Sequence, residues 1–87
     1  MNFEQIRQAQ ALKSKLDKAQ KELKRMQIEG EAGKGAVTIV VNGEQRIISV
    51  KLSPEVVDAR NIKKLEELII KAVNDAQEKA QKAAAEQ

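Results

Sequence analysis

The chain has 87 residues, a formal net charge of +3 at pH 7, and no cysteine or histidine. These absences exclude disulfides and thiolate metal sites, and they remove the commonest general base and the commonest transition-metal ligand. Phe3 is the only aromatic residue, so the core must be aliphatic and thin. A chain this short buries only about 60–65% of its unfolded surface. We therefore expect one domain over residues 1–87 that gains stability by pairing with a second copy.

Residues 3–26 favour a long helix, because they contain no glycine or proline and are rich in Gln, Lys, Leu and Ala. A helix of about 24 residues spans roughly 36 Å. Apolar residues recur every three or four positions, at Ala9, Leu12, Leu16, Ala19, Leu23 and Met26. This heptad-like spacing predicts an apolar seam along one side, which needs a partner.

Positive charge is concentrated in the same helix. Residues 1–26 have a net charge of +4, residues 27–53 are neutral, and residues 54–87 have a net charge of −1. Most of the cations fall opposite the seam, at Arg7, Lys18, Lys21, Lys24 and Arg25, with Lys13 and Lys15 flanking them. A stripe of this kind without aromatic residues suits contacts to the backbone phosphates of duplex DNA rather than stacking on single strands. The alternative is an ordinary solvated helix face with pairs such as Asp17–Lys21 and Lys18–Glu22.

The glycine-rich segment GEAGKG, residues 30–35, is a candidate phosphate-binding loop. A Walker-type loop needs Ser or Thr after its lysine and a helix after that, whereas here Gly35 and a β-branched run follow Lys34. We therefore predict that these glycines form a turn at the corner of a sheet. Ser49 and Ser53 are better explained as a strand residue and a cap. We accordingly expect a protein that is not an enzyme and needs no metal, cofactor or small-molecule substrate.

The runs AVTIVV and QRIISVKL predict two strands joined by a two-residue Asn42-Gly43 turn. Pairing Val41 with Glu44 gives two faces. The first carries Val37, Ile39, Val41, Ile48, Val50 and Leu52, and the second carries Ala36, Thr38, Val40, Ile47 and Ser49. We expect a helix over the first face and partial cover over the second. The segment MQIEGEA, residues 26–32, should add a short strand antiparallel to the first.

The C-terminal third predicts a second long helix. Ser53-Pro54-Glu55 is a favourable helix start, and Asn61 is a cap for the main helix. One apolar side follows, at Ile62, Leu65, Ile69, Ala72, Ala76, Ala80 and Ala83. Because this side weakens to alanine after residue 76, we expect the end of the helix to project from the sheet and fray.

The predicted fold is α+β with the order α-β-β-β-α. Strands of about seven residues span roughly 23 Å, so both long helices must extend beyond the sheet. We expect a homodimer with protruding helical arms, joined through Val40, Ile47, Leu16 and Leu23. The N-terminal residues lack an apolar run of signal-peptide length, and no segment reaches the roughly 20 apolar residues of a membrane span. We therefore expect a cytoplasmic protein without membrane contacts.

Three segments together resemble the YbaB/EbfC nucleoid-associated proteins of bacteria. They are KRMQIEGEAGKGAVTIVVNGE (24–44), LSPEVVD (52–58) and LEELIIKAVNDAQEKAQ (65–81), the last with an Asn-Asp-Ala element at residues 74–76. The resemblance covers nearly the whole chain and rests on the order and spacing of these segments. It implies a tweezers-like α–β–α homodimer that binds DNA with modest sequence preference in the nucleoid and takes part in nucleoid organisation and gene regulation.

On this hypothesis the DNA-binding cations are Arg7, Lys13, Lys18, Lys21, Lys24 and Arg25, with Lys79 and Lys82 on the second arm. The alternative hypothesis is a helical-arm scaffold or chaperone-like module, because the helix–hairpin–helix layout is also loosely similar to prefoldin subunits.

Overall fold

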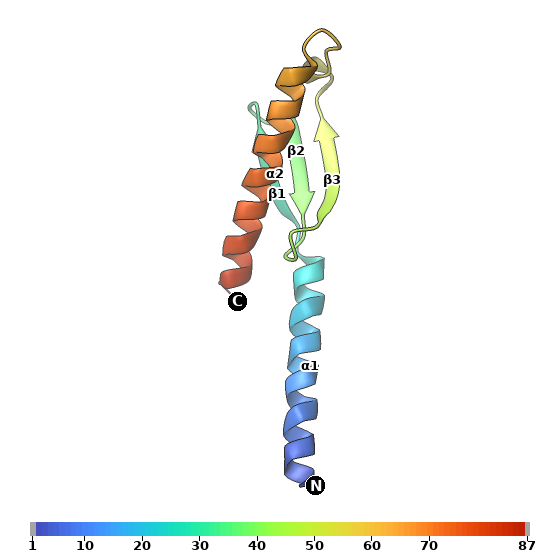
Figure 1. Cartoon of the computed structure of the whole chain (residues 1–87), viewed down its shortest axis with the longest axis vertical. Helices are drawn as coiled ribbons and strands as arrows, with labels where there is room; N and C mark the ends of the chain where they lie inside the picture. The colour runs from blue at the N-terminus through green and yellow to red at the C-terminus, as the bar shows by residue number, and fades with distance from the viewer. Residues whose placement is uncertain (1, 87) are drawn as a thin grey trace.

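A long helix projects from one end of a small sheet, and a second helix lies along the sheet (Figure 1). The structure is a computed structural model that describes residues 2–86. Its elements are α1 (Phe3–Arg25), β1 (Ile28–Ala32), β2 (Val37–Val41), β3 (Ile47–Leu52), the 3-10 turn η1 (Pro54–Val56) and α2 (Ile62–Ala85). The molecule measures 68 × 20 × 16 Å. The predicted α-β-β-β-α order is confirmed.

The three strands form one antiparallel sheet in the order β1-β2-β3. Gly30 of β1 lies opposite Ile39 of β2, and Ile39 lies opposite Val50 of β3. A register shift after Val40 sets Val41 opposite Ile47. The predicted pairing of Val41 with Glu44 is therefore wrong, because the connection between β2 and β3 is longer than two residues.

The side chain of Asn42 shapes the β2–β3 connection. Its Oδ1 accepts hydrogen bonds from the backbone N–H groups of Glu44 at 2.9 Å and Arg46 at 3.0 Å. The residue with positive φ in this turn is Gln45, at 66°, rather than Asn42 or Gly43. An Asn side chain that bonds the backbone two residues ahead is a common turn-forming device, and here it replaces the predicted two-residue turn.

Gly43 joins α1 to the sheet. Its N–H donates to the carbonyl of Leu23 at 2.7 Å, and this carbonyl in the last turn of α1 also accepts from the N–H of Met26 at 3.3 Å. A Cβ at residue 43 would lie 2.8 Å from Cδ2 of Leu23 and 2.9 Å from Sδ of Met26. Glycine is therefore required here for close packing, and not for the two-residue turn that the sequence predicted.

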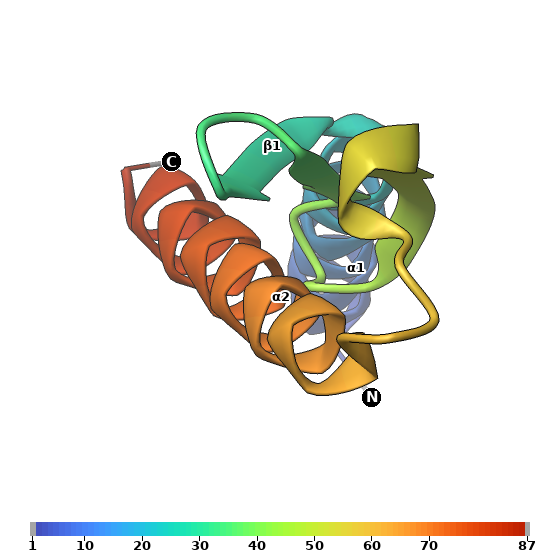
Figure 2. The ribbon, with the colours of Figure 1, turned by 90° about the horizontal axis from the view of Figure 1, so that it is seen from above.

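The core lies between β2 and α2. Val37, Ile39 and Val41 are fully buried, and so are the three alanines that face them, Ala72, Ala76 and Ala80. The predicted helix over the first face is thus confirmed for β2. It is wrong for β3, where Val50 remains 51% exposed and all six residues are open to solvent. Figure 2 shows α2 running past β1 and β2, with β3 on the far side.

Small residues let α2 lie close to β1. A Cβ on Gly30 would overlap the backbone nitrogen of Ala76 and lie 2.5 Å from its Cα. Because alanines continue this close contact, Ala80 is fully buried and the helix extends to Ala85. The apolar side of α2 weakens to alanine after residue 76, and this was expected to let the end of the helix project from the sheet. That prediction is wrong for the part of the helix up to Ala80, which stays packed.

The caps of the C-terminal part differ from the prediction in detail. Ser53 and Asn61 occupy the cap positions of η1 and α2, but neither side chain makes a capping hydrogen bond. The N–H of Ser53 instead donates to the carbonyl of Ala36 at 2.8 Å, which extends the β2–β3 ladder by one residue pair.

Candidate nucleic-acid interface

Helix α1 is exposed along nearly its whole length, and of its residues only Leu23 is half-buried. Asn2 caps its first turn, with Oδ1 accepting from the N–H of Glu4 at 3.1 Å. None of the residues in Phe3–Arg25 is buried, and the seam residues Leu12 and Leu16 are 60% and 57% exposed. The helix therefore offers solvent both an apolar seam and a basic side.

The basic side forms a straight stripe. Arg7 and Arg25 are 18 residues apart, which is five helical turns, so they point in the same direction about 27 Å apart along the axis. Lys18 lies within roughly 20° of that line, and Leu16 points about 180° away from Arg7. The remaining cations of α1 flank the stripe, and all are exposed: Lys13, Lys15, Lys21 and Lys24.

The cations of α1 are not neutralised by nearby acids. In residues 2–86 the ion pairs are Arg60–Asp58 at 3.2 Å and Lys79–Asp75 at 3.0 Å. The pairs Asp17–Lys21 and Lys18–Glu22, expected for an ordinary solvated face, are not formed. The stripe is therefore available to an external polyanion.

The two cations proposed on α2 differ from each other. Lys79 is held by Asp75, whose Oδ2 also accepts a hydrogen bond from the N–H of Glu31 at 3.1 Å. That backbone hydrogen bond is the main cause of the lowered pKa of Asp75, and Lys79 lowers the pKa further. Lys82 lies in the last turn of α2 and is exposed. The C-terminal end of α2, which carries both lysines, lies toward the end of the sheet from which α1 projects (Figure 1).

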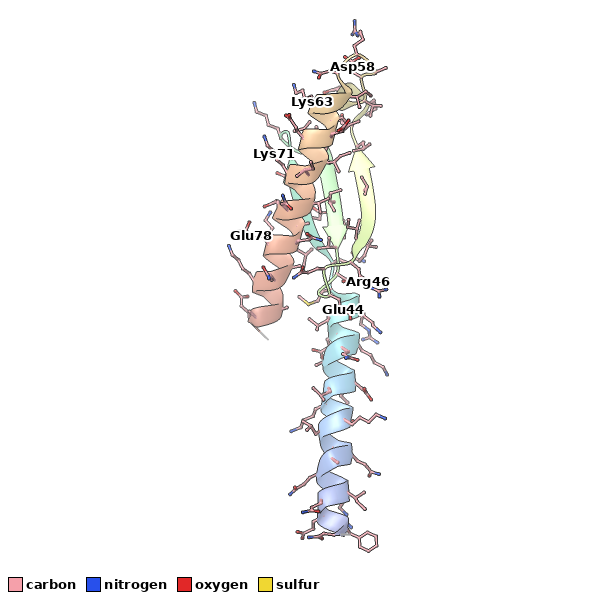
Figure 3. The ribbon with its side chains drawn as sticks, viewed as in Figure 1. Glu44, Arg46, Asp58, Lys63, Lys71 and Glu78 are labelled. Carbon is pink, nitrogen blue, oxygen red and sulfur yellow. The ribbon has the colours of Figure 1, made fainter. Side chains whose placement is uncertain are left out.

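The Asn-Asp-Ala element acquires a structural explanation that the sequence did not supply. Asp75 binds an N–H on the outer edge of β1, and Ala76 fits against Gly30. Asn74 is exposed. Figure 3 shows Lys71 and Glu78 on the outer side of α2, away from the sheet. The only sequence signal for the role of Asp75 was its place in the Asn-Asp-Ala element, next to the small residue Ala76.

The four predicted dimer-interface residues are not gathered in one place on the chain. Val40 is half-buried in β2, and Ile47 is 50% exposed at the start of β3. Leu16 is exposed on the projecting part of α1. Leu23 is half-buried against Gly43 of its own chain. Their role in assembly stays a prediction.

The GKG segment forms a turn. Gly33, Lys34 and Gly35 all have positive φ, and the N–H of Ala36 donates to the carbonyl of Gly33 at 3.2 Å. Strand β2 follows directly, so no helix N-terminus faces the glycines. The predicted sheet corner is confirmed.

A small hollow lies at the opposite end of the sheet. Glu55, Asp58, Asn61 and Lys64 line it together with Val56, and its volume is about 120 Å³, small beside the roughly 300–1,000 Å³ of typical ligand pockets. Within residues 2–86, no three His, Cys, Asp or Glu side chains come together as a metal site would require. The described helices also include none long and apolar enough to span a membrane.

Comparison with known proteins gives a consistent result. The model of the YbaB/EbfC DNA-binding family matches residues 1–87. A nucleoid-associated protein of Chloroflexus aurantiacus is 42% identical over 87 residues, covering 99% of this chain and 87% of the relative. One from Syntrophobacter fumaroxidans is 42% identical over 85 residues, covering 98% of this chain and 77% of the relative. The crystal structure of an uncharacterized protein from Helicobacter pylori has the same fold, with a TM-score of 0.82 at 15% identity and coverage of 99% of this chain and 91% of that one.

Proposed function

Because the chain belongs to the YbaB/EbfC DNA-binding family, we propose that it binds duplex DNA through the basic stripe of α1. The observation that carries this proposal is the line of Arg7, Lys18 and Arg25 on a helix whose cations have no ion-pair partner among the described residues. The stripe is about 27 Å long, comparable with the roughly 34 Å helical repeat of duplex DNA. One helix can therefore follow several phosphates within a single turn of the duplex.

The chemistry of the stripe favours phosphate contacts over base readout. Flexible Lys and Arg side chains on an exposed helix reach phosphate oxygens easily, and phosphate contacts carry no sequence information directly. We therefore propose modest sequence preference, arising mainly from DNA shape. As a homodimer the protein would present two such helices. The names of the relatives support a role in the nucleoid, in the cytoplasm, and no enzymatic activity is part of the proposal.

The cations of α2 play a smaller part in this proposal. Lys82 is free to add a contact near the base of α1, whereas Lys79 must first give up its 3.0 Å pair with Asp75. We therefore expect Lys82 to contribute more to affinity than Lys79.

The test is the salt dependence of binding, measured by fluorescence anisotropy with a labelled duplex of random sequence. For each phosphate neutralised, log K should change with log salt with a slope of about −0.9. The variant with Lys18→Gln and Lys21→Gln removes two contacts per chain, so the slope of a dimer should become shallower by roughly 3 to 4. Circular dichroism should show that the helices remain.

A matched control is the variant with Lys63→Gln and Lys64→Gln. These lysines are exposed in the first turn of α2, and Figure 3 shows Lys63 at the end of the sheet opposite α1. This variant loses the same charge but should keep the slope of the wild-type protein. Equal slopes for the α1 variant and the wild-type protein would refute the assignment. No binding even at low salt would favour the scaffold or chaperone-like alternative.

A further inference from the structure

The tip of α1 carries the only aromatic side chain of the chain. Phe3 is the first residue of the helix, at the end farthest from the sheet (Figure 1), and it is 80% exposed. Burial in this fold therefore does not account for the ring. Because single exposed apolar residues are common on protein surfaces, the side of the helix on which Phe3 lies decides what the ring can contact.

Phe3 lies on the basic side of α1 and not with the apolar seam. At 3.6 residues per turn, the seam residues Leu16 and Leu23 point about 140° and 160° away from Phe3. The line through Arg7 and Arg25 is only about 40° away. Phe3 also precedes Arg7 by four residues, which is about 6 Å along the helix axis. A partner that lies against the basic stripe therefore meets the ring of Phe3 as well.

The ring adds a different chemistry to the end of the stripe. The stripe itself consists of cations, which contact phosphates, whereas an uncharged ring gains nothing from a phosphate. The apolar part of duplex DNA is its stack of base pairs. Proteins that deform DNA insert Phe, Leu or Ile side chains between base pairs from the minor groove and partly unstack them. From Phe3 to Arg25 the surface is about 33 Å long, close to the roughly 34 Å helical repeat of the duplex.

We propose that Phe3 is a wedge that inserts between two base pairs of the bound duplex, from the minor groove. This proposal rests on the DNA binding of the proposed function and adds a contact to the bases. Arg7, one helical turn away, holds a phosphate beside the opened step. The wedge also gives a physical source for a modest sequence preference, because TA and other pyrimidine–purine steps unstack easily whereas A-tracts are stiff.

The first test compares the affinity of Phe3→Ala and the wild-type protein for two duplexes of equal length, one with TA steps and one an A-tract. The wild-type protein should prefer the TA duplex. Phe3→Ala should lose this preference and bind the TA duplex at least about fivefold more weakly. Its salt slope should equal that of the wild-type protein, because Phe3 has no charge. Alanine favours helices more than phenylalanine does, so circular dichroism should show no loss of helix.

The second test detects the unstacking itself. The fluorescence of 2-aminopurine, placed at the TA step, rises when the base unstacks, and the chain has no Trp or Tyr to interfere. The wild-type protein should raise this fluorescence and Phe3→Ala should not, whereas Phe3→Leu should keep part of the rise because leucine also serves as a wedge. The matched control is Ile6→Ala. Ile6 is 39% exposed near the same tip but points about 100° away from the stripe, so this variant should behave as the wild-type protein does.

Three results would overturn the proposal. Equal affinities of Phe3→Ala and the wild-type protein for the TA duplex would mean that the ring does not contact the bases. A fluorescence rise that persists in Phe3→Ala would mean that another group opens the step. A changed sedimentation coefficient of free Phe3→Ala would mean that the ring is a contact between protein copies.

The salt dependence separates failure of the wedge from failure of the proposed function. A steep salt slope in both proteins, with equal affinities, would reject the wedge and leave the phosphate contacts of the stripe standing. A wild-type protein without salt-dependent binding would reject the proposed function, and the wedge with it.

Discussion

The tight contact between Gly30 and Ala76 makes Gly30→Ala a sensitive test of how α2 lies on the sheet. The added Cβ would lie 2.5 Å from both Cα and Cβ of Ala76, and it would overlap the backbone nitrogen of the same residue. Ordinary contact begins at about 3.4 Å, so α2 must move away from β1 by about 1 Å. Backbone atoms cannot rotate aside to relieve this contact.

The displacement of α2 determines how much the free energy of unfolding of Gly30→Ala falls. Overpacking a core usually costs about 1–3 kcal/mol. We expect the upper half of that range, about 2–3 kcal/mol, because a gap of 1 Å removes a quarter to a half of the dispersion energy of each separated contact. Ala72, Ala76 and Ala80 all belong to the one buried cluster of the described chain, so the loss falls on the centre of the fold.

The assay is urea unfolding followed by far-ultraviolet circular dichroism, since the chain has no Trp or Tyr for fluorescence. Protein concentration must be equal in all samples, because the stability of the proposed homodimer would depend on it. A loss of about 2–3 kcal/mol lowers the thermal midpoint by roughly 8–24 °C in a domain of this size. Glu29→Ala, in the same strand but exposed, is the matched control and should change stability by less than about 0.5 kcal/mol.

A double variant sharpens the test. Adding Ala76→Gly to Gly30→Ala removes one of the three blocking atoms but leaves the backbone nitrogen and Cα of residue 76 in place. Little of the lost stability should therefore return. If the free energy of unfolding of Gly30→Ala lies within about 0.5 kcal/mol of the wild-type value, Ala76 of α2 is not in tight contact with Gly30 of β1.

Two further predictions concern the contacts that hold the helices to the sheet. Asp75 has a pKa held below its ordinary value of 3.8, so its stabilising effect should be full above that value and should fade as the pH falls through the lowered pKa. In the Asp75→Asn variant the urea midpoint should therefore fall less steeply with decreasing pH below about pH 4 than in the wild-type protein. Equally steep falls in the two proteins would contradict this prediction. Gly43→Ala should loosen the base of α1, because its Cβ would lie 2.9 Å from the carbonyl oxygen of Leu23. Hydrogen exchange of the amide of residue 43 should speed up relative to Glu44→Ala, and equal protection in the two variants would contradict the anchoring role.

Most of the fold could be predicted from the sequence because its signals are local. The spacing of Leu12, Leu16 and Leu23 specifies a helix, and the β-branched runs around Val37 and Ile48 specify strands. The basic stripe followed from the same helical period. These patterns depend on neighbouring residues and need no knowledge of distant parts of the chain.

The predictions that the structure contradicts concern places where segments far apart in the sequence pack together. The register of the hairpin could not be predicted from Asn42-Gly43. Gly43 packs against Leu23 of α1, and the side chain of Asn42 closes the turn by accepting a hydrogen bond from the N–H of Glu44. The exposure of Val50 depends on which strands α2 covers, and that depends on the close contact of Gly30 with Ala76. An alternating pattern shows that a face is apolar, but it does not show which element covers it.

The exposed stripe of α1 is proposed to bind the phosphates of duplex DNA, and the decisive measurement is the salt dependence of the wild-type affinity. If both helices of a dimer use at least Arg7, Lys18 and Arg25, a plot of log K against log salt should be linear with a slope of about −5 or steeper. A slope near zero, or no measurable binding to duplex DNA at low salt, would contradict the claim.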